Sequence, residues 1–139
     1  MLRKHLLATL CASVLITATV PVLAASSQTM KSEAGTLEVT PIVTGLEHPW
    51  ALAFLPDGKN MLVTERPGNL RLVSADGKLS APLNGVPKVW AKGQGGLLDV
   101  ALSPDFKQDR MVYLSYAEGG GKGNKAGTAV GRGRLSDDM

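Results

Sequence analysis

One repeated pattern constrains the fold of this chain more than any other feature of the sequence. Residues 52–57 (LAFLPD) align with residues 100–105 (VALSPD), which places Pro56 and Pro104 48 positions apart. In both copies a polar turn follows, and then a β-type run, residues 61–64 (MLVT) or 111–115 (MVYLS). Four strands in about 48 residues is the period of a β-propeller blade. The repeat predicts an all-β propeller, with a β-sandwich as the second compatible architecture.

Short strand-like runs alternate with turn signals along the rest of the chain. The turns are expected at residues 56–59 (PDGK), 67–69 (PGN) and 75–78 (ADGK), where proline and glycine supply the required backbone angles. After residue 25, no helical periodicity extends over ten residues. The pattern therefore indicates strands at residues 37–40, 50–55, 61–64 and 70–74.

The number of blades decides whether a ring can close. One blade is expected over residues 50–93, and a second is expected to begin at Leu97 and to end after its third strand near Leu135. A propeller needs roughly four to eight blades, and six at this period would take about 290 residues. We expect the chain to hold only the first two blades of a six-bladed ring, as the N-terminal part of a longer protein.

The N-terminus has the features of a secretory signal peptide. Arg3 and Lys4 form a basic start, an apolar run follows to Val20, and small residues precede a cleavage position after Ala24. The apolar run of about 15 residues is shorter than the ~20 that span a bilayer. Residues 1–24 are therefore predicted to be removed, residues 25–36 to form a flexible leader or a loose strand, and residues 37–139 to form the propeller part. A periplasmic or secreted location follows, without a membrane span in the mature chain.

Charge and cysteine content exclude several classes of function. Without Arg3 and Lys4, the excess of basic over acidic side chains falls from three to one, which gives no reason to expect nucleic-acid binding. Cys11 is the single cysteine and lies in the predicted signal peptide. A mature chain without cysteine has neither a disulfide nor a thiolate metal site.

Four stretches are expected on the ligand-binding face of a propeller: residues 47–50, 64–69, 92–96 and the glycine-rich segment 119–127. In the first two, His48 precedes a proline and is interpreted as a turn residue, Trp50 as an aromatic packed between blades, and Glu65 with Arg66 as a pair in a solvated loop. The glycine-rich segment lacks the features of a phosphate loop and is interpreted as a flexible surface loop.

Gln94 is the most informative polar residue of these stretches. Its side chain has two donors and one acceptor, and the flanking glycines in residues 93–96 (GQGG) allow a ligand to approach closely. That combination suits a polar cofactor, although glutamine is also common in turns. Asp99 and Asp105 have no partner carboxylate at a useful spacing, so the sequence shows no acid–base pair.

Five short motifs follow one another along the chain: residues 48–52 (HPWAL), 64–66 (TER), 93–98 (GQGGLL), 104–106 (PDF) and 131–135 (GRGRL). Taken in this order, they resemble the soluble aldose sugar dehydrogenases of the glucose/sorbosone dehydrogenase family. The resemblance implies a quinoprotein on a six-bladed propeller that oxidises the anomeric hydroxyl of an aldose to a lactone. Pyrroloquinoline quinone (PQQ) would take the hydride, Ca²⁺ would hold and polarise the quinone, and an external acceptor would take the electrons.

The resemblance carries over to one residue. Gln94 matches the glutamine that lies at the quinone and sugar site of the family. The catalytic histidine of the family belongs to a later motif beyond residue 139, and the quinone-binding basic residues and calcium ligands belong to later blades. The expected chain therefore has no catalytic residue and no metal ligand, binds neither PQQ nor Ca²⁺, and is inactive alone. A secreted non-catalytic binding module, or the product of a truncated pseudogene, is the alternative.

Overall fold

The computed structural model describes residues 26–121 and 125–137, and these residues are almost entirely β-structure. The predicted signal peptide, including Cys11, lies outside them. Eight strands and one short helix follow one another in the order β1 (Gln28–Ser32), β2 (Gly35–Val39), β3 (Pro49–Phe54), β4 (Met61–Glu65), β5 (Asn69–Val73), β6 (Leu97–Leu102), α1 (Phe106–Asp109), β7 (Met111–Gly121) and β8 (Lys125–Arg134). Within the described residues, no helix is long and apolar enough to cross a membrane.

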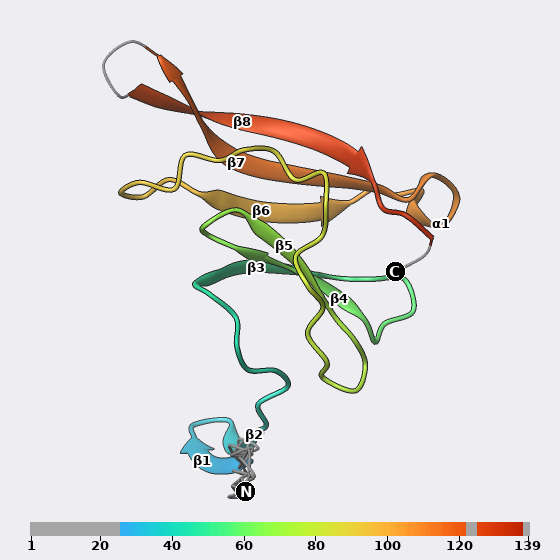
Figure 1. Cartoon of the computed structure of the whole chain (residues 1–139). Helices are drawn as coiled ribbons and strands as arrows, with labels where there is room; N and C mark the ends of the chain where they lie inside the picture. Colours follow the sequence, from blue (N-terminus) through green and yellow to red (C-terminus); the bar gives the residue numbers. More distant parts are fainter. Residues whose placement is uncertain (1–25, 122–124, 138–139) are drawn as a thin grey trace, which may run out of the picture.

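Two antiparallel sheets, β3-β4-β5 and β6-β7-β8, form the main body and lie one above the other (Figure 1). We call them the first blade and the second blade. Strand β6 packs across β3 and β4, so that the inner strands of the two blades meet. The all-β fold and its two blades confirm the prediction from the repeat, and the described residues form no closed ring of sheets.

The two blades repeat a structural irregularity as well as a sequence. The strand register shifts between Pro49 and Leu52 in the first blade and between Leu97 and Val100, 48 positions later, in the second. A β-bulge leaves a backbone amide without its ladder partner, and a hydroxyl takes its place in both blades. The Ala51 amide donates to Thr64 Oγ1 at 3.1 Å, and the equivalent Asp99 amide donates to Ser115 Oγ at 3.0 Å.

The hydrophobic core lies between the blades. From the first blade it takes Leu62, Leu70 and the half-buried alanines of β3, and from the second it takes Val100, Leu114 and Tyr116. Small residues on β3 allow β6 to approach closely, whereas large residues on the second blade fill the remaining space. The interface between the blades is therefore the main apolar contact of the chain.

The first blade has three strands rather than the four expected. Residues 78–83 run beside β5, but Leu79 makes only an isolated bridge to Val73. Ser80 takes over part of the ladder, because its Oγ accepts from the Leu72 amide and its own amide donates to the Leu72 carbonyl. Pro82 and Pro87 both lie in the connection between β5 and β6. Neither has an amide proton to donate, so a regular fourth strand does not form.

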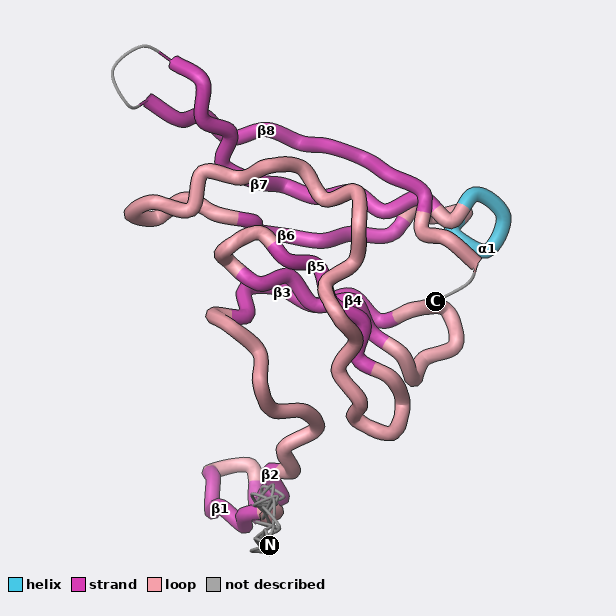
Figure 2. The backbone as a smooth tube through the Cα atoms, in the orientation of Figure 1, coloured by secondary structure: helices cyan, strands magenta, loops and turns pink. Residues whose placement is uncertain are grey.

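A separate hairpin of β1 and β2 precedes the blades, and Figure 2 shows the long loop that joins it to them. Every residue of both strands is exposed. The hairpin includes most of residues 25–36, the segment expected as a flexible leader or a loose strand. Residues 42–44 (IVT), whose alternation is weak, are loop.

Candidate functional site

Three of the four predicted loops meet at one end of the two blades, and Arg66 joins them. The Arg66 amide donates to the His48 carbonyl at 3.0 Å, and the Arg66 carbonyl accepts from the Leu97 amide at 3.0 Å. The Arg66 guanidinium also donates through Nη1 to the Gly93 carbonyl at 3.0 Å. Arg66 therefore fixes the loops that precede β3 and β6 to the turn between β4 and β5.

Two glycines make this close approach possible. Gly96 has a φ of +154°, and a Cβ at this position would lie 2.4 Å from the Arg66 carbonyl oxygen. A Cβ on Gly95 would lie 2.4 Å from the Trp90 carbonyl oxygen. Any side chain would push these backbone segments apart, so glycine is required at both positions.

Gln94 lies in the exposed turn that these contacts hold in place. The turn is closed by the Gly95 amide, which donates to the Lys92 carbonyl at 2.9 Å. Gly93, next to it, has a φ of +57° and open space where a Cβ would point. Among the described residues, the Gln94 amide group has no hydrogen-bond partner, which leaves its donors and acceptor available to a ligand.

Glu65 does not pair with Arg66 in a solvated loop, so that prediction is wrong. Its side chain is fully buried, and its carboxylate faces Arg71 at 3.3 Å. The Glu47 amide donates to Glu65 Oε1 at 2.7 Å, and the Asn69 side-chain amide donates to Oε2 at 3.0 Å. Glu65 thus ties the loop before β3, the β4–β5 turn and β5 together.

The electrostatics of Glu65 fit this anchoring role. Burial alone would raise the pKa of the carboxyl group, but hydrogen bonds from Glu47 and Asn69 and the charge of Arg71 outweigh it and lower the pKa below its ordinary value. The sequence contained a signal for the burial of Glu65. Glu65 follows Val63 at the two-residue period of β4, which places both side chains on the same buried face of the strand.

His48 and Trp50 differ in how well they fit their predictions. His48 has a φ of 48°, is exposed, and uses its carbonyl to hold Arg66, which agrees with a turn residue. Trp50 was predicted to pack between blades, but its side chain is 53% exposed. The reason is positional, because the described residues place no sheet on that side of β3.

The fourth predicted stretch is not a flexible loop in the residues described. Strand β7 runs to Gly121 and β8 begins at Lys125, so most of this segment is a long hairpin, with residues 122–124 outside the described part. The Trp90 amide donates to the Ala117 carbonyl at 2.7 Å, and a Cβ on Gly119 would lie 2.5 Å from the Trp90 ring. The hairpin therefore packs beside the segment that leads to Gln94.

The remaining candidate side chains show no catalytic or metal-binding cluster within residues 26–121 and 125–137. Asp99 accepts a hydrogen bond from the Val100 amide, and Asp105 precedes the short helix α1. In the same residues, no three His, Cys, Asp or Glu side chains gather as a potential metal site.

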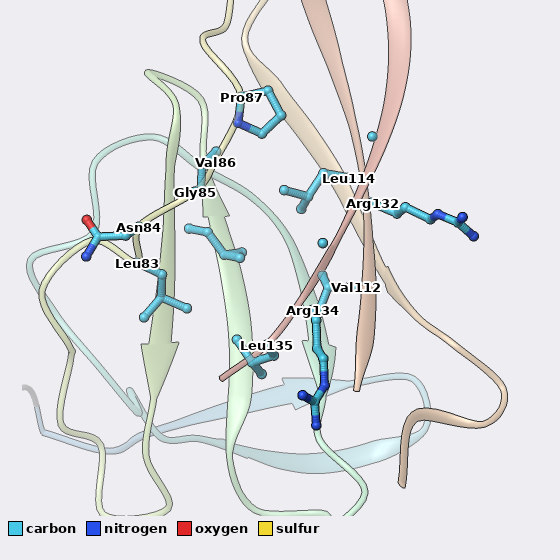
Figure 3. Close-up of a pocket in the computed structure, with 13 residues that line it drawn as sticks. Leu83, Asn84, Gly85, Val86, Pro87, Val112, Leu114, Arg132, Arg134 and Leu135 are labelled. Carbon is cyan, nitrogen blue, oxygen red and sulfur yellow. The ribbon is translucent and has the colours of Figure 1, made fainter. Parts of the chain in front are cut away.

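A cavity of about 350 Å³ lies between the two blades, where the connection 83–87 faces strands β7 and β8 (Figure 3). Its lining is mainly apolar, with Leu83 and Val86 facing Leu114 and Leu135. The side chain of Arg132 extends away from this apolar group. Gln94 and the loops held by Arg66 do not line the cavity, so it belongs to the packing of the blades.

Comparisons with known proteins agree on one family. Residues 46–139 match the family described as Glucose / Sorbosone dehydrogenase. An aldose sugar dehydrogenase of Escherichia coli strain K12 is 58% identical over 120 residues, which cover 86% of this chain and 32% of that protein. The chain thus spans about a third of the length of this curated relative.

Solved structures give the same result. The apo-form of the soluble aldose sugar dehydrogenase from Escherichia coli superimposes with a TM-score of 0.64 and 67% identity, over 67% of this chain and 26% of that one. The PQQ-bound form of an aldose sugar dehydrogenase from Streptomyces coelicolor superimposes with a TM-score of 0.60 and 31% identity, over 82% and 30%.

Proposed function

The chain belongs to the glucose/sorbosone dehydrogenase family, and from this premise we propose that it supplies two blades of a periplasmic quinoprotein that oxidises aldose sugars to lactones. When bound, PQQ would supply the hydride acceptor of this chemistry and Ca²⁺ would supply a Lewis acid, and Gln94 is the residue of this chain that would contact the quinone or the sugar. An external acceptor would take the electrons. The observation that carries the proposal is the Gln94 turn, which combines the glutamine motif of the family with a rigid, exposed geometry.

The residues around Gln94 are suited to a polar quinone. The amide side chain can donate and accept hydrogen bonds, and a Cβ on Gly93 would meet no atom within 4 Å, so a ligand can approach the backbone of the turn closely. Arg66 and Lys92 bring positive charge to the same turn, which favours an acidic cofactor. We propose that Gln94 orients the quinone or the sugar by hydrogen bonding, while the Arg66 contacts keep its turn in place.

A chimera tests this role in a complete ring. Residues 46–139 would replace the matching part of the Escherichia coli relative, and sugar-dependent dye reduction would be measured with PQQ and Ca²⁺. We expect an active chimera in which Gln94→Ala lowers kcat/KM about tenfold, the effect of losing roughly one or two hydrogen bonds. Gln108→Ala, which removes an exposed glutamine of α1, is the matched control and should leave kcat/KM unchanged. A folded but inactive chimera would favour the binding-module alternative.

We further propose that the 139-residue chain does not oxidise sugars by itself. One glutamine cannot hold a quinone, and His48 serves a turn rather than a base. Purified chain loaded with PQQ and Ca²⁺ should therefore reduce no dye with glucose. Dye reduction above the level of free PQQ would contradict this proposal.

Export is the remaining part of the proposal. It rests on the basic and apolar pattern of residues 1–24. Mass spectrometry of the chain recovered from the periplasm of a bacterial host should find an N-terminus at Ala25. An intact Met1 in that fraction would contradict cleavage.

A further inference from the structure

Residues 90–96 form a closed loop whose two ends bond to one residue of β7. The Trp90 amide donates to the Ala117 carbonyl at 2.7 Å, and the Ala117 amide donates to the Gly96 carbonyl at 2.8 Å. Strand β6 first pairs with β7 at Tyr116, one position earlier. The two ends of the loop therefore take the place that a strand partner of Ala117 would occupy.

Gln94 lies in the exposed turn of this loop, which we call the Gln94 loop. A Cβ on Gly95 would lie 2.4 Å from the Trp90 carbonyl oxygen and 3.0 Å from the Ala117 Cβ. The returning half of the loop thus lies directly against its first half and against β7. The position of Gln94 therefore depends on how firmly the two ends of the loop stay on β7.

The indole of Trp90 is the single large apolar side chain of the Gln94 loop. It is half-buried and lies against the backbone of the β7–β8 hairpin, where a Cβ on Gly119 would lie 2.5 Å from the ring atom Cε3. The Lys92 ammonium lies 4.6 Å from the ring centroid, within the range of a cation–π interaction. The ring therefore attaches the loop to the hairpin through a side chain, in addition to the two backbone bonds at Ala117.

Arg66 holds the Gln94 loop from the first blade, at Gly93 and at Leu97. In the described residues, no hydrogen bond from Arg66 reaches the beginning of the loop at Trp90. Without the indole, the hydrogen bond from the amide of residue 90 to Ala117 would be open to competition from water. The indole therefore fixes the end of the loop that Arg66 does not contact.

We propose that Trp90 is a positioning residue for Gln94 and acts through the contact of its ring with Gly119. A rigid loop presents the Gln94 amide group in one orientation, and a displacement of about 1 Å is enough to weaken catalysis. The inference rests on the proposed function of Gln94 as the contact for the quinone or the sugar. Trp90 contacts neither of them, so its whole effect on catalysis passes through Gln94.

A double-mutant cycle in the chimera that carries residues 46–139 tests this dependence. Trp90→Ala should lower kcat/KM about fivefold, and by no more than the loss of about tenfold expected for Gln94→Ala. In a chimera that already carries Gln94→Ala, Trp90→Ala should change kcat/KM by less than about twofold, because no side chain remains to be positioned. Trp90→Phe keeps an aromatic ring at the contact and should restore kcat/KM to within about twofold of the parent.

Gly119 offers an independent variant that leaves the indole in place. Gly119→Ala puts a methyl group where the ring lies, so it should displace Trp90 and lower kcat/KM about as much as Trp90→Ala. Once the ring is absent the methyl group has space, so Gly119→Ala should have no further effect in Trp90→Ala. Gly120→Ala, on the same strand, is the matched control, because a Cβ there would meet no atom within 4 Å. It should leave kcat/KM unchanged.

The backbone order parameter of Gln94 gives a readout apart from activity. It would be measured by NMR on the full chain, as secreted by a bacterial host, without PQQ or Ca²⁺. We expect a value of about 0.85 in the parent and in Gly120→Ala, and below about 0.6 in Trp90→Ala and in Gly119→Ala.

The outcomes separate this inference from the proposed function. If Gln94→Ala leaves kcat/KM unchanged, the proposed role of Gln94 fails and the inference fails with it. If Gln94→Ala lowers kcat/KM but Trp90→Ala lowers it equally in both backgrounds, the positioning role alone fails. An unchanged order parameter of Gln94 in Trp90→Ala overturns the positioning role even where the chimera is inactive.

Discussion

The two blades are built alike at the level of the backbone and differ in what surrounds them. Each has a bulge at the start of its inner strand, a hydroxyl that fills the bulge, and a Pro-Asp turn at the end of the strand. Yet Val100 is buried whereas Leu52, its counterpart, is more than half exposed. The repeated sequence therefore determines that each inner strand forms, whereas the presence or absence of a neighbouring sheet determines whether its side chains are buried.

A second difference lies at one pair of equivalent positions. Glu65 is opposite Pro49 in the first blade, and Tyr116 is opposite Leu97 in the second. Tyr116 joins the hydrophobic core, whereas Glu65 is a buried carboxylate with three partners. The first blade must hold the loop that arrives from the hairpin, and a charged group with several hydrogen bonds does this where an apolar side chain could not.

The difference in burial between the two blades is tested most directly by the same substitution at two equivalent positions. Val100→Asp buries a carboxylate in the core and should lower the free energy of unfolding by about 4 kcal/mol or more. Leu52→Asp should cost about 1 kcal/mol, the scale of strand preference at an exposed site. Urea unfolding monitored by tryptophan fluorescence would measure both. Equal losses would show that this face of β3 is covered in solution.

Removal of the buried carboxylate should have the next largest effect. Glu65→Ala leaves Arg71, Asn69 and the Glu47 amide without their partner, and should destabilise the chain by about 3 kcal/mol. Glu47→Ala removes an exposed carboxylate from the same loop and keeps its amide, so it should stay within about 0.5 kcal/mol of the parent. Thermal unfolding would compare them, and similar midpoints for both variants would refute the anchoring role.

The hydroxyl groups of Thr64 and Ser115 should differ less in their contribution to stability. Thr64→Val loses a fully buried group that makes hydrogen bonds both within its blade and to Leu98, and should cost about 1 to 2 kcal/mol. Ser115→Ala loses a single bond at a half-buried position and should cost about 0.5 kcal/mol. Hydrogen exchange at the Ala51 and Asp99 amides would report each loss locally. A larger effect for Ser115 would show that its blade face is covered.

The dependence of stability on pH should reflect Glu65 as well. Its pKa in the folded chain lies below the ordinary value of 4.5, so its contribution is fully present above that pH and is lost as pH falls toward the folded pKa. The parent should therefore lose stability below about pH 4.5 more steeply than Glu65→Gln. Asp57, Asp76 and Asp109 act in the same direction, since the pKa of each is lowered by hydrogen bonds. The difference between parent and variant isolates Glu65, and parallel curves would contradict its lowered pKa.

Local patterns predicted the strands and the site loops well, because alternation and turn residues act over a few positions. The repeat around Pro56 and Pro104 located both blades, and the glycines around Gln94 indicated an exposed turn that the structure contains. The exposure of Trp50 was missed because it depends on segments far away in the sequence, whereas the burial of Glu65 was missed although the alternation along β4 carried a local signal. The glycines of residues 119–121 indicated a loop, but pairing with residues 125–127 makes them strand, since cross-strand hydrogen bonds outweigh their weak local preference.

The order of the strands has a consequence for synthesis. Each blade consists of strands that are consecutive in the chain, so the first sheet can form from local contacts before the second has been made. Its side toward the second blade, with Leu62 and Leu70, then stays in contact with water until residues 97–102 arrive. At the usual rate of translation of about 5–20 residues per second, the wait lasts a few seconds. During that interval the nascent chain exposes an apolar sheet face, and the length of the connection between β5 and β6 sets how long that face stays exposed.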